Sequence, residues 1–210
     1  HFKENISVLV DIGAHHGETI KLFNKEFNVN KIFSFEASKK NYFNLVNKNR
    51  HTKNLKTYNF AIGEEEKIVE FSEHFETQSS TISKINFKSK YYKKKNFFLN
   101  PFKNSNKKIN VVKINMKRLD NVFRELNINH VDILKIDTEG YDFQVVKGLG
   151  KSIKIVKYIY FEHHFHDMLE KNYNLSDIND YLYNNNFKKV FKSKMRFRKT
   201  FEYIYFNRSY

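Results

Sequence analysis

The stretch Val8-Leu-Val-Asp-Ile-Gly-Ala-His-His-Gly17 contains an apolar run, one acidic residue and two glycines. Residues 6–10 predict a strand buried on both faces, because this part is short, apolar and rich in β-branched side chains. Asp11 follows the strand, and a turn with both glycines leads into a helix that begins near Glu18. Glycine lets a backbone approach a ligand closely, and a helix N-terminus offers free N–H groups. The stretch therefore predicts a cofactor-binding turn in an α/β sheet.

Hydrophobic periodicity predicts strands that alternate with helices along the chain. The first five elements follow the order β-α-β-α-β, which implies right-handed crossovers and a parallel sheet. We expect one domain over residues 1–210, trimmed of upstream elements, with a flap or insertion over residues 75–110 where periodicity disappears. Ser176 is expected to cap the last helix, and residues 163–171 to begin as a loop and turn helical. The predicted strands cover residues 6–10, 31–35, 55–62, 67–72, 111–116, 130–136, 157–162, 187–192 and 201–207, and the predicted helices cover residues 18–27, 39–50, 119–126, 141–149 and 176–184.

The composition combines a net charge of +15 with a complete absence of cysteine. Such a charge is typical of proteins that bind nucleic acid or a membrane surface. However, the abundance of Lys, Asn, Phe, Tyr and Ile also fits AT-rich codons, and we favour this explanation. Without cysteine there is no disulfide framework, thiolate metal site or cysteine nucleophile, which fits the reducing cytoplasm. No stretch approaches the ~20 apolar residues of a membrane span, and an apolar signal region is absent, so we expect a cytoplasmic protein.

Two acidic residues follow the first two predicted strands and indicate the kind of cofactor. Asp11 stands where a nicotinamide-type fingerprint has its first glycine. A carboxylate here would repel a pyrophosphate but can pair with an ammonium group, such as that of S-adenosylmethionine. Glu36 follows the strand predicted over residues 31–35 and can accept both hydroxyls of a ribose. Ala61 and Ile62 at the end of the third predicted strand are expected to flank an adenine ring.

A further acidic pair lies in the stretch Lys135-Ile-Asp-Thr-Glu-Gly-Tyr-Asp-Phe-Gln-Val-Val-Lys-Gly148. Asp137 and Glu139 fall at the carboxyl end of the fourth parallel strand, beside the first strand, where α/β sheets bind ligands. Together with residues 10–14, this stretch resembles the FkbM family of S-adenosylmethionine-dependent methyltransferases. The resemblance runs in order from Val8 to about Tyr205, and its other matching pieces are Gly17, Phe35-Glu36, Ala61-Ile-Gly63, Ser79-Ser-Thr81 and Tyr160-Phe-Glu162.

The resemblance implies a class I methyltransferase fold, a Rossmann-like three-layer sandwich. Its seven-stranded, mostly parallel sheet has the order 3-2-1-4-5-7-6 with the last strand antiparallel. It further implies that Asp137 and Glu139 face the methyl-transfer site. Two features depart from the family, namely His15-His16, where an Asn and a small or apolar residue are frequent, and the long Lys-rich flap. The cofactor contacts that it implies are Asp11, Gly13, Ala14, Gly17 and Glu36, and we expect Ala61, Ile62 and Asp137 to contact the cofactor as well.

Three histidines follow the strand predicted over residues 157–162. Methyl transfer to a hydroxyl requires removal of its proton, so His163 or His164 is a candidate base beside Asp137 and Glu139. A divalent metal bound with Asp137 would serve the same purpose by lowering the pKa of the hydroxyl, but we expect no metal. Alternatively, some of these histidines are ordinary loop residues.

Residues 84–113 contain ten lysines and no acidic residue, with aromatic residues between them. This pattern fits a flap that binds single-stranded nucleic acid, a flap over an anionic sugar, or a solvated insertion. Taken together, the sequence predicts an O-methyltransferase that uses S-adenosylmethionine and acts on a small molecule or a sugar or glycan hydroxyl. The alternatives are an RNA methyltransferase that uses the basic flap and a methyltransferase-fold binding module without catalysis, whereas Asp11 disfavours a nicotinamide-dependent reductase.

Overall fold

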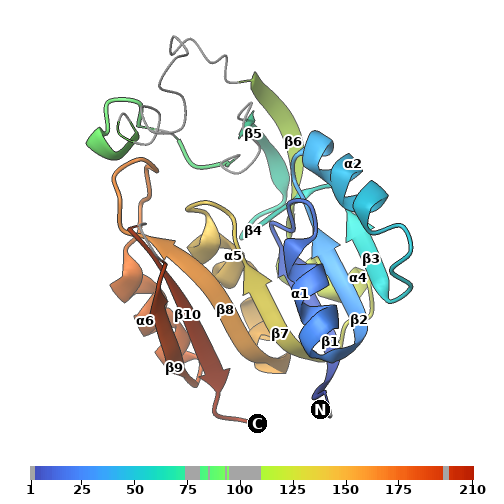
Figure 1. Cartoon of the computed structure of the whole chain (residues 1–210). Coiled ribbons are helices and arrows are strands. Elements are labelled where there is room, and N and C mark those ends of the chain that lie inside the picture. Colours follow the sequence, from blue (N-terminus) through green and yellow to red (C-terminus); the bar gives the residue numbers. More distant parts are fainter. Residues whose placement is uncertain (1–2, 74–80, 85, 93, 95–109, 196–198) are drawn as a thin grey trace.

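The computed structural model describes residues 3–73, 81–84, 86–92, 94, 110–195 and 199–210. A seven-stranded sheet with the order β3-β2-β1-β7-β8-β10-β9 forms its centre (Figure 1). All pairings from β3 to β8 are parallel, and β10 is antiparallel to both of its neighbours. Numbered along the chain within this sheet, the order is the predicted 3-2-1-4-5-7-6. The strands are β1 (Asn5–Ile12), β2 (Asn28–Phe35), β3 (Leu55–Tyr58), β7 (Val131–Ile136), β8 (Val156–His164), β9 (Phe187–Lys194) and β10 (Thr200–Asn207).

Helices cover both faces of this sheet and complete the predicted three layers. On one face, α1 (Glu18–Glu26) and α2 (Lys39–Lys48) bury Ile20 and Leu45 against Leu9 and Ile32. On the other face, a larger apolar cluster joins the sheet to α4 (Leu119–Glu125), α5 (Asp142–Gly148), the 3₁₀ helix η2 (Gly150–Ile155) and α6 (Leu175–Asn184). In the described residues, no helix has the length and apolar character needed to cross a bilayer.

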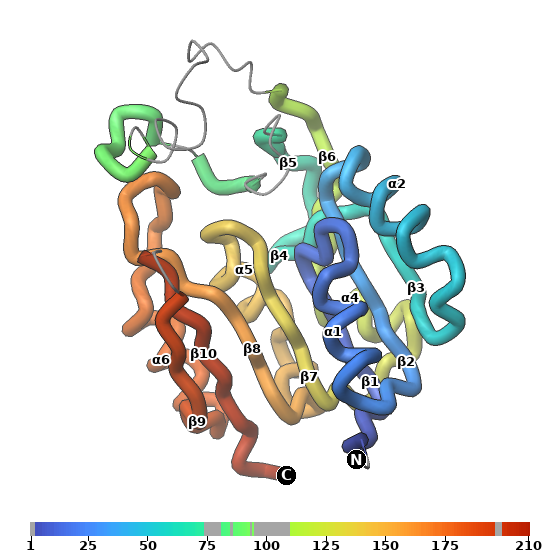
Figure 2. The backbone as a smooth tube through the Cα atoms, viewed as in Figure 1, coloured from blue at the N-terminus to red at the C-terminus, as the bar shows by residue number. Residues whose placement is uncertain are grey.

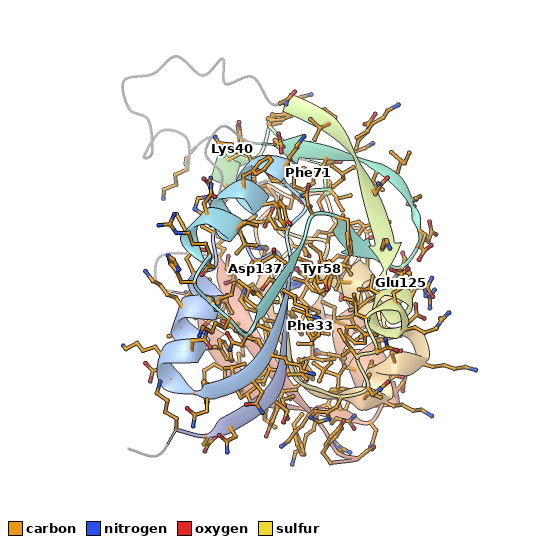
Figure 3. The ribbon with its side chains drawn as sticks, turned by 90° about the vertical axis from the view of Figure 1, so that its right-hand side faces the viewer. Phe33, Lys40, Tyr58, Phe71, Glu125 and Asp137 are labelled. Atoms are coloured by element: carbon orange, nitrogen blue, oxygen red, sulfur yellow. The ribbon has the colours of Figure 1, made fainter. Side chains whose placement is uncertain are left out.

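A second, three-stranded sheet with the order β4-β6-β5 lies beside the carboxyl edge of the central sheet. It contains β4 (Ala61–Gly63), β5 (Lys67–Glu73) and β6 (Asn110–Arg118), so the extra strand predicted over residues 67–72 is confirmed. In the side view of Figure 3, Phe71 of β5 lies above Asp137 and Tyr58. The second sheet therefore covers the edge at which the parallel strands end. The two termini lie at the opposite edge (Figure 2).

The single strand predicted over residues 55–62 is wrong, because the structure divides it between the two sheets. β3 ends at Tyr58, whereas β4 pairs with β6. Between them, the side-chain amide of Asn59 donates a hydrogen bond of 2.8 Å to the carbonyl of Glu36. The sequence did not show the break because apolar residues continue on both sides of it.

Two local predictions near the C-terminus are also wrong. Residues 165–171 form no helix, and β8 continues through His164. Helix α6 is capped by Asn174 and not by Ser176, because Asn174 and Asp177 form a reciprocal capping box. The Ser176 backbone N–H is instead a donor to the Asn174 side chain. Most of the predicted flap over residues 75–110 lies outside the described residues.

Candidate active site

A cavity of about 440 Å³ lies at the carboxyl ends of β1, β2, β7 and β8. Its size falls within the ~300–1,000 Å³ of typical ligand pockets. It also lies at the switch point between β1 and β7, where doubly wound sheets bind ligands. Apolar side chains of β4, β5 and nearby segments form one wall, and polar groups from the carboxyl edge form the rest. The lining residues include Phe35, Phe60, Ala61, Ile62, Phe71 and Ile82 in the apolar part, and His15, Glu18, Glu36, Asn41, Lys135, Asp137, Thr138, Glu139 and Glu162 in the polar part.

The turn after β1 is held against β2 and β7. The backbone N–H groups of Gly13 and Ala14 both donate to the carbonyl of Phe35, at 2.9 and 3.1 Å. Gly13 has a φ of +80°, and a Cβ there would lie 1.9 Å from the Asp137 carbonyl oxygen. A Cβ on Gly17 would instead meet the Asn49 side chain at 2.4 Å. The two glycines thus allow protein segments to approach one another, and of the two only Gly13 also lines the cavity.

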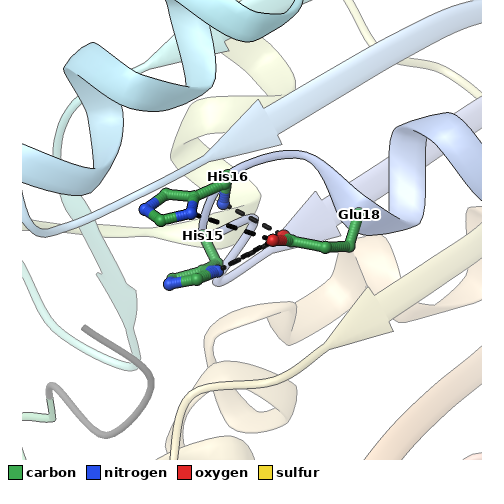
Figure 4. Close-up of side chains that lie close together, drawn as sticks. All are labelled: His15, His16 and Glu18. Atoms are coloured by element: carbon green, nitrogen blue, oxygen red, sulfur yellow. Dashed lines mark hydrogen bonds and ion pairs between the residues drawn. The ribbon is translucent and has the colours of Figure 1, made fainter. Parts of the chain in front are cut away.

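His15, His16 and Glu18 form a compact cluster where α1 begins (Figure 4). The Glu18 carboxylate accepts a hydrogen bond from the His16 backbone N–H at 3.1 Å and lies 3.3 Å from His15 Nδ1, while the two imidazole rings stack. Their potential ligand atoms lie within 4.8 Å of one another. However, Lys48 Nζ lies 3.1 Å from His16 Nδ1, and the helix N-terminus carries positive potential, so both oppose a bound cation.

Glu36 connects the turns that follow β1 and β2. Its Oε2 accepts the backbone N–H of His15 at 2.8 Å, and its Oε1 accepts that of Ser38 at 2.9 Å. Burial raises the pKa of Glu36 to about 7, although these two N–H groups favour the ionised form. The side chain of Asn41 also forms a hydrogen bond with this carboxylate, which is therefore fixed in the cavity wall and retains lone-pair capacity for a further donor.

Asp11 lies beneath the cavity and does not line it. It is opposite Lys135 in the β1–β7 register, and Lys135 Nζ lies 3.7 Å from its Oδ1. Burial raises the pKa of Asp11 to about 6, and neither carboxylate oxygen has a hydrogen-bond partner among the described residues. The ion pair with Lys135 is the contact that stabilises this buried charge. A direct contact of Asp11 with a ligand ammonium group, as the sequence suggested, would require a rearrangement of the cavity floor.

The loop after β7 presents Asp137, Thr138 and Glu139 to the cavity. Lys135 Nζ donates to Asp137 Oδ2 at 3.3 Å. Two hydroxyls from the segment after β5 hold the loop: Thr81 Oγ1 donates to the Glu139 carbonyl at 2.8 Å, and Ser83 Oγ donates to the Gly140 carbonyl at 2.9 Å. The Ser79-Ser-Thr81 part of the family resemblance thus includes a contact with this loop through Thr81. Ser79 and Ser80 lie outside the described residues.

The two histidines predicted as bases do not line the cavity. His163 packs against Phe165 and Tyr173, and burial lowers its pKa to about 4. His164 Nδ1 lies 3.0 Å from Thr200 Oγ1, and its Nε2 lies 3.5 Å from Glu139 Oε2. Burial, with the nearby His166, lowers the pKa of His164 to about 3. The structure therefore brings Asp137 and Glu139 into the cavity and leaves both histidines outside its lining.

Glu162 lines the cavity but was not among the predicted site residues. Burial and the neighbouring charge of Asp137 raise its pKa to about 7. The sequence did contain a signal for it, because Glu162 ends the strand predicted over residues 157–162 and so falls at the carboxyl edge. The adjacent histidines are more common as catalytic bases, so the sequence pattern favoured them over Glu162.

Comparisons with known proteins show the family to which this chain belongs. The family model of the methyltransferase FkbM domain matches residues 11–189. An FkbM methyltransferase structure from Methylobacillus flagellatus KT is 15% identical with a TM-score of 0.62, and the alignment covers 98% of this chain but 44% of that one. A search of the curated proteins gives no match.

Two other solved structures share the fold at lower identity. The Streptococcus pneumoniae protein Sp1610 in complex with S-adenosyl-L-methionine is 10% identical over 98% of this chain and 67% of its own, with a TM-score of 0.53. An rRNA methylase from Streptococcus thermophilus is 6% identical over 98% of this chain and 89% of its own, with a TM-score of 0.53. At these identities the likeness shows the fold alone. Since the family model covers most of the sequence, the chain belongs to the FkbM methyltransferase family.

Proposed function

We propose that this chain is an S-adenosylmethionine-dependent O-methyltransferase that acts on a neutral, hydroxyl-rich small molecule such as a sugar or glycan. The observation that carries the proposal is the cavity at the switch point between β1 and β7. Glu36 lies on the β2 side of this cavity, and Asp137, Glu139 and Glu162 lie on the β7 and β8 side. Family membership supports the methyl-transfer chemistry.

The residues of the β1, β2 and β4 side fit the cofactor. Glu36 would accept hydrogen bonds from the ribose hydroxyls, and the buried Ala61 and Ile62 would flank the adenine. Gly13, Ala14 and Asp137 would complete this part of the site, since they also line the cavity. Asp11 would act through the negative potential that it adds beneath the floor, and Gly17 through the shape of the turn. S-adenosylmethionine, when bound, supplies an electrophilic methyl group on a sulfonium.

The negative charge of the cavity lining favours a neutral acceptor over a nucleic acid. The protein has a net charge of +15. The charge of the lining has the opposite sign, because among the described residues it contains Glu18, Glu36, Asp137, Glu139 and Glu162 against a single lysine. These carboxylates would repel phosphate groups near the transferred methyl group. Sugar hydroxyls, in contrast, are good donors to carboxylates.

Two assays test the proposal. Titration calorimetry should detect S-adenosylmethionine binding to the wild type, with a loss of about tenfold in affinity for Glu36→Gln and no loss for Glu26→Gln, an exposed control at the end of α1. Tritium transfer from methyl-labelled S-adenosylmethionine should then label a panel of methyl glycosides and not total RNA. Label in RNA would replace the sugar acceptor with an RNA acceptor. Binding without any transfer would instead favour a binding module.

A further inference from the structure

Glu162 is positioned at the reacting end of the cavity by its strand. In the parallel β7–β8 register, Ile136 pairs with Phe161. Asp137, which directly follows β7, and Glu162 of β8 are therefore neighbours on adjacent backbones ~4.8 Å apart, with side chains on the same face of the sheet. Both side chains line the cavity. Glu162 thus lies beside the loop that is expected to face the methyl-transfer site.

The charges around Glu162 leave it with an excess of negative neighbours. Lys135 is the nearby cation, but its Nζ already lies 3.3 Å from Asp137 Oδ2 and 3.7 Å from Asp11 Oδ1. Burial and the excess of negatively charged neighbours raise the pKa of Glu162 to about 7. A carboxylate that ionises near neutral pH is well matched to accept a proton in catalysis. The groups that act on Glu162 are Lys135 of β7, Asp137 directly after β7, Tyr160 of its own strand, Asp142 of α5 and Glu202 of β10.

The other candidate bases are engaged elsewhere. Asp137 accepts a hydrogen bond from the Lys135 ammonium, and Glu139 faces His164 at 3.5 Å. His164 in turn contacts Thr200. Within the described part of the chain, no hydrogen bond is formed by the Glu162 carboxylate. We propose that Glu162 is the catalytic base that removes the proton from the acceptor hydroxyl, an inference that rests on the proposed O-methyltransferase function.

The proposed step conserves atoms and charge. The acceptor oxygen gives its proton to the Glu162 carboxylate and forms the new bond to the methyl carbon of S-adenosylmethionine. The electron pair of the broken carbon–sulfur bond stays on sulfur, so that S-adenosylhomocysteine and the methyl ether are the products. The proton then passes from Glu162 to water, which restores the carboxylate for the next turnover.

The test compares Glu162→Gln with Glu202→Gln and uses a methyl glycoside labelled in the tritium assay. Glu202 is a matched control, because it is opposite Glu162 in the β8–β10 register, accepts a hydrogen bond from Tyr160 and does not line the cavity. For Glu162→Gln, kcat should fall by roughly 10²- to 10⁴-fold, with cofactor Kd and acceptor KM unchanged within about threefold. The wild-type kcat should rise with pH through about 7, and Glu162→Gln should lose this rise. Glu202→Gln should retain most of the activity and the rise itself, shifted to lower pH because one negative neighbour of Glu162 is removed.

A second readout does not depend on turnover. In protein with ¹³C-labelled glutamate side chains, the carboxyl resonance that disappears in Glu162→Gln should titrate near pH 7. Titration at the ordinary glutamate value would overturn the inference, as would a Glu162→Gln enzyme that loses less than about tenfold in kcat or keeps the pH rise. If the wild type binds no S-adenosylmethionine, the proposed function fails. The resonance still tests Glu162 in that case, and an ordinary pKa there overturns the inference separately.

Discussion

Replacement of Gly13 by alanine gives a direct test of how β1 and β7 are joined. The new Cβ would lie 1.9 Å from the Asp137 carbonyl oxygen, at a φ of +80°. A left-handed backbone costs a non-glycine residue roughly 1–2 kcal/mol. The backbone fixes the position of the Cβ, and the carbonyl is part of the backbone, so relief of the clash requires the two strand ends to separate. That separation would weaken the hydrogen bonds from Gly13 N–H to Phe35 and from Asp137 N–H to Ile12, both 2.9 Å long and each worth about 1 kcal/mol.

We therefore expect Gly13→Ala to lower the free energy of unfolding by about 3–4 kcal/mol, a large part of the ~5–15 kcal/mol of a typical domain. Gly17→Ala is the matched control, because it has a similar φ of +90° but meets the terminal amide of Asn49. That side chain can rotate away, which weakens its two part-buried hydrogen bonds to the carbonyls of His16 and Leu45. The loss should be about 2–3 kcal/mol, from the backbone strain and about 0.5 kcal/mol for each of these bonds.

The assay is urea unfolding followed by far-ultraviolet circular dichroism, with linear extrapolation to water. The reasoning predicts that Gly13→Ala costs more than Gly17→Ala. A Gly17→Ala loss that equals or exceeds the Gly13→Ala loss would refute it. A Gly13→Ala protein within about 1 kcal/mol of wild type would also refute it, because the contact with the Asp137 carbonyl would then not constrain the fold.

Three further outcomes follow from the same site. Burial raises the pKa of Asp11 from 3.8 to about 6. Between these two values of pH the folded state therefore binds more protons than the unfolded state. The contribution of Asp11 to the free energy of unfolding falls as pH rises through this range, by at most ~3 kcal/mol. Asp11→Asn should remove this component in urea unfolding measured from pH 4 to 7, and an unchanged pH slope would contradict it. Thr81→Val should cost about 2 kcal/mol, because the Thr81 hydroxyl donates to the Glu139 carbonyl at 2.8 Å and accepts the Ser83 backbone N–H at 2.9 Å. It should lower kcat more than it raises cofactor Kd, and equal effects on both constants would argue against a role confined to the loop. Methyl transfer should be unchanged after dialysis against EDTA, and a loss that Mg²⁺ restores would reveal a metal-assisted reaction.

The sequence alone determined the fold and the edge at which the site lies. Short apolar runs alternate with amphipathic helices, and this pattern admits few arrangements besides a doubly wound parallel sheet. Residues at the carboxyl ends of such strands meet at one edge, so Glu36, Asp137 and Glu139 could be assigned to one site before any coordinates were known. The division of residues 55–62 between two sheets could not be predicted, since both halves are apolar and the choice of pairing partner depends on β6, far along the chain.

Only the tertiary structure decided which of the polar groups face the cavity. Successive side chains of a strand point to opposite faces, so Glu162 and His163 do so as well. The register with β7 places Glu162 beside Asp137, on the face that lines the cavity. Likewise, Asp11 lies opposite Lys135 and is buried beneath the floor, although its position after β1 suggested direct contact with a ligand. Sequence reasoning places residues along an element, but burial, pairing and the resulting pKa values depend on neighbours that are distant in the chain.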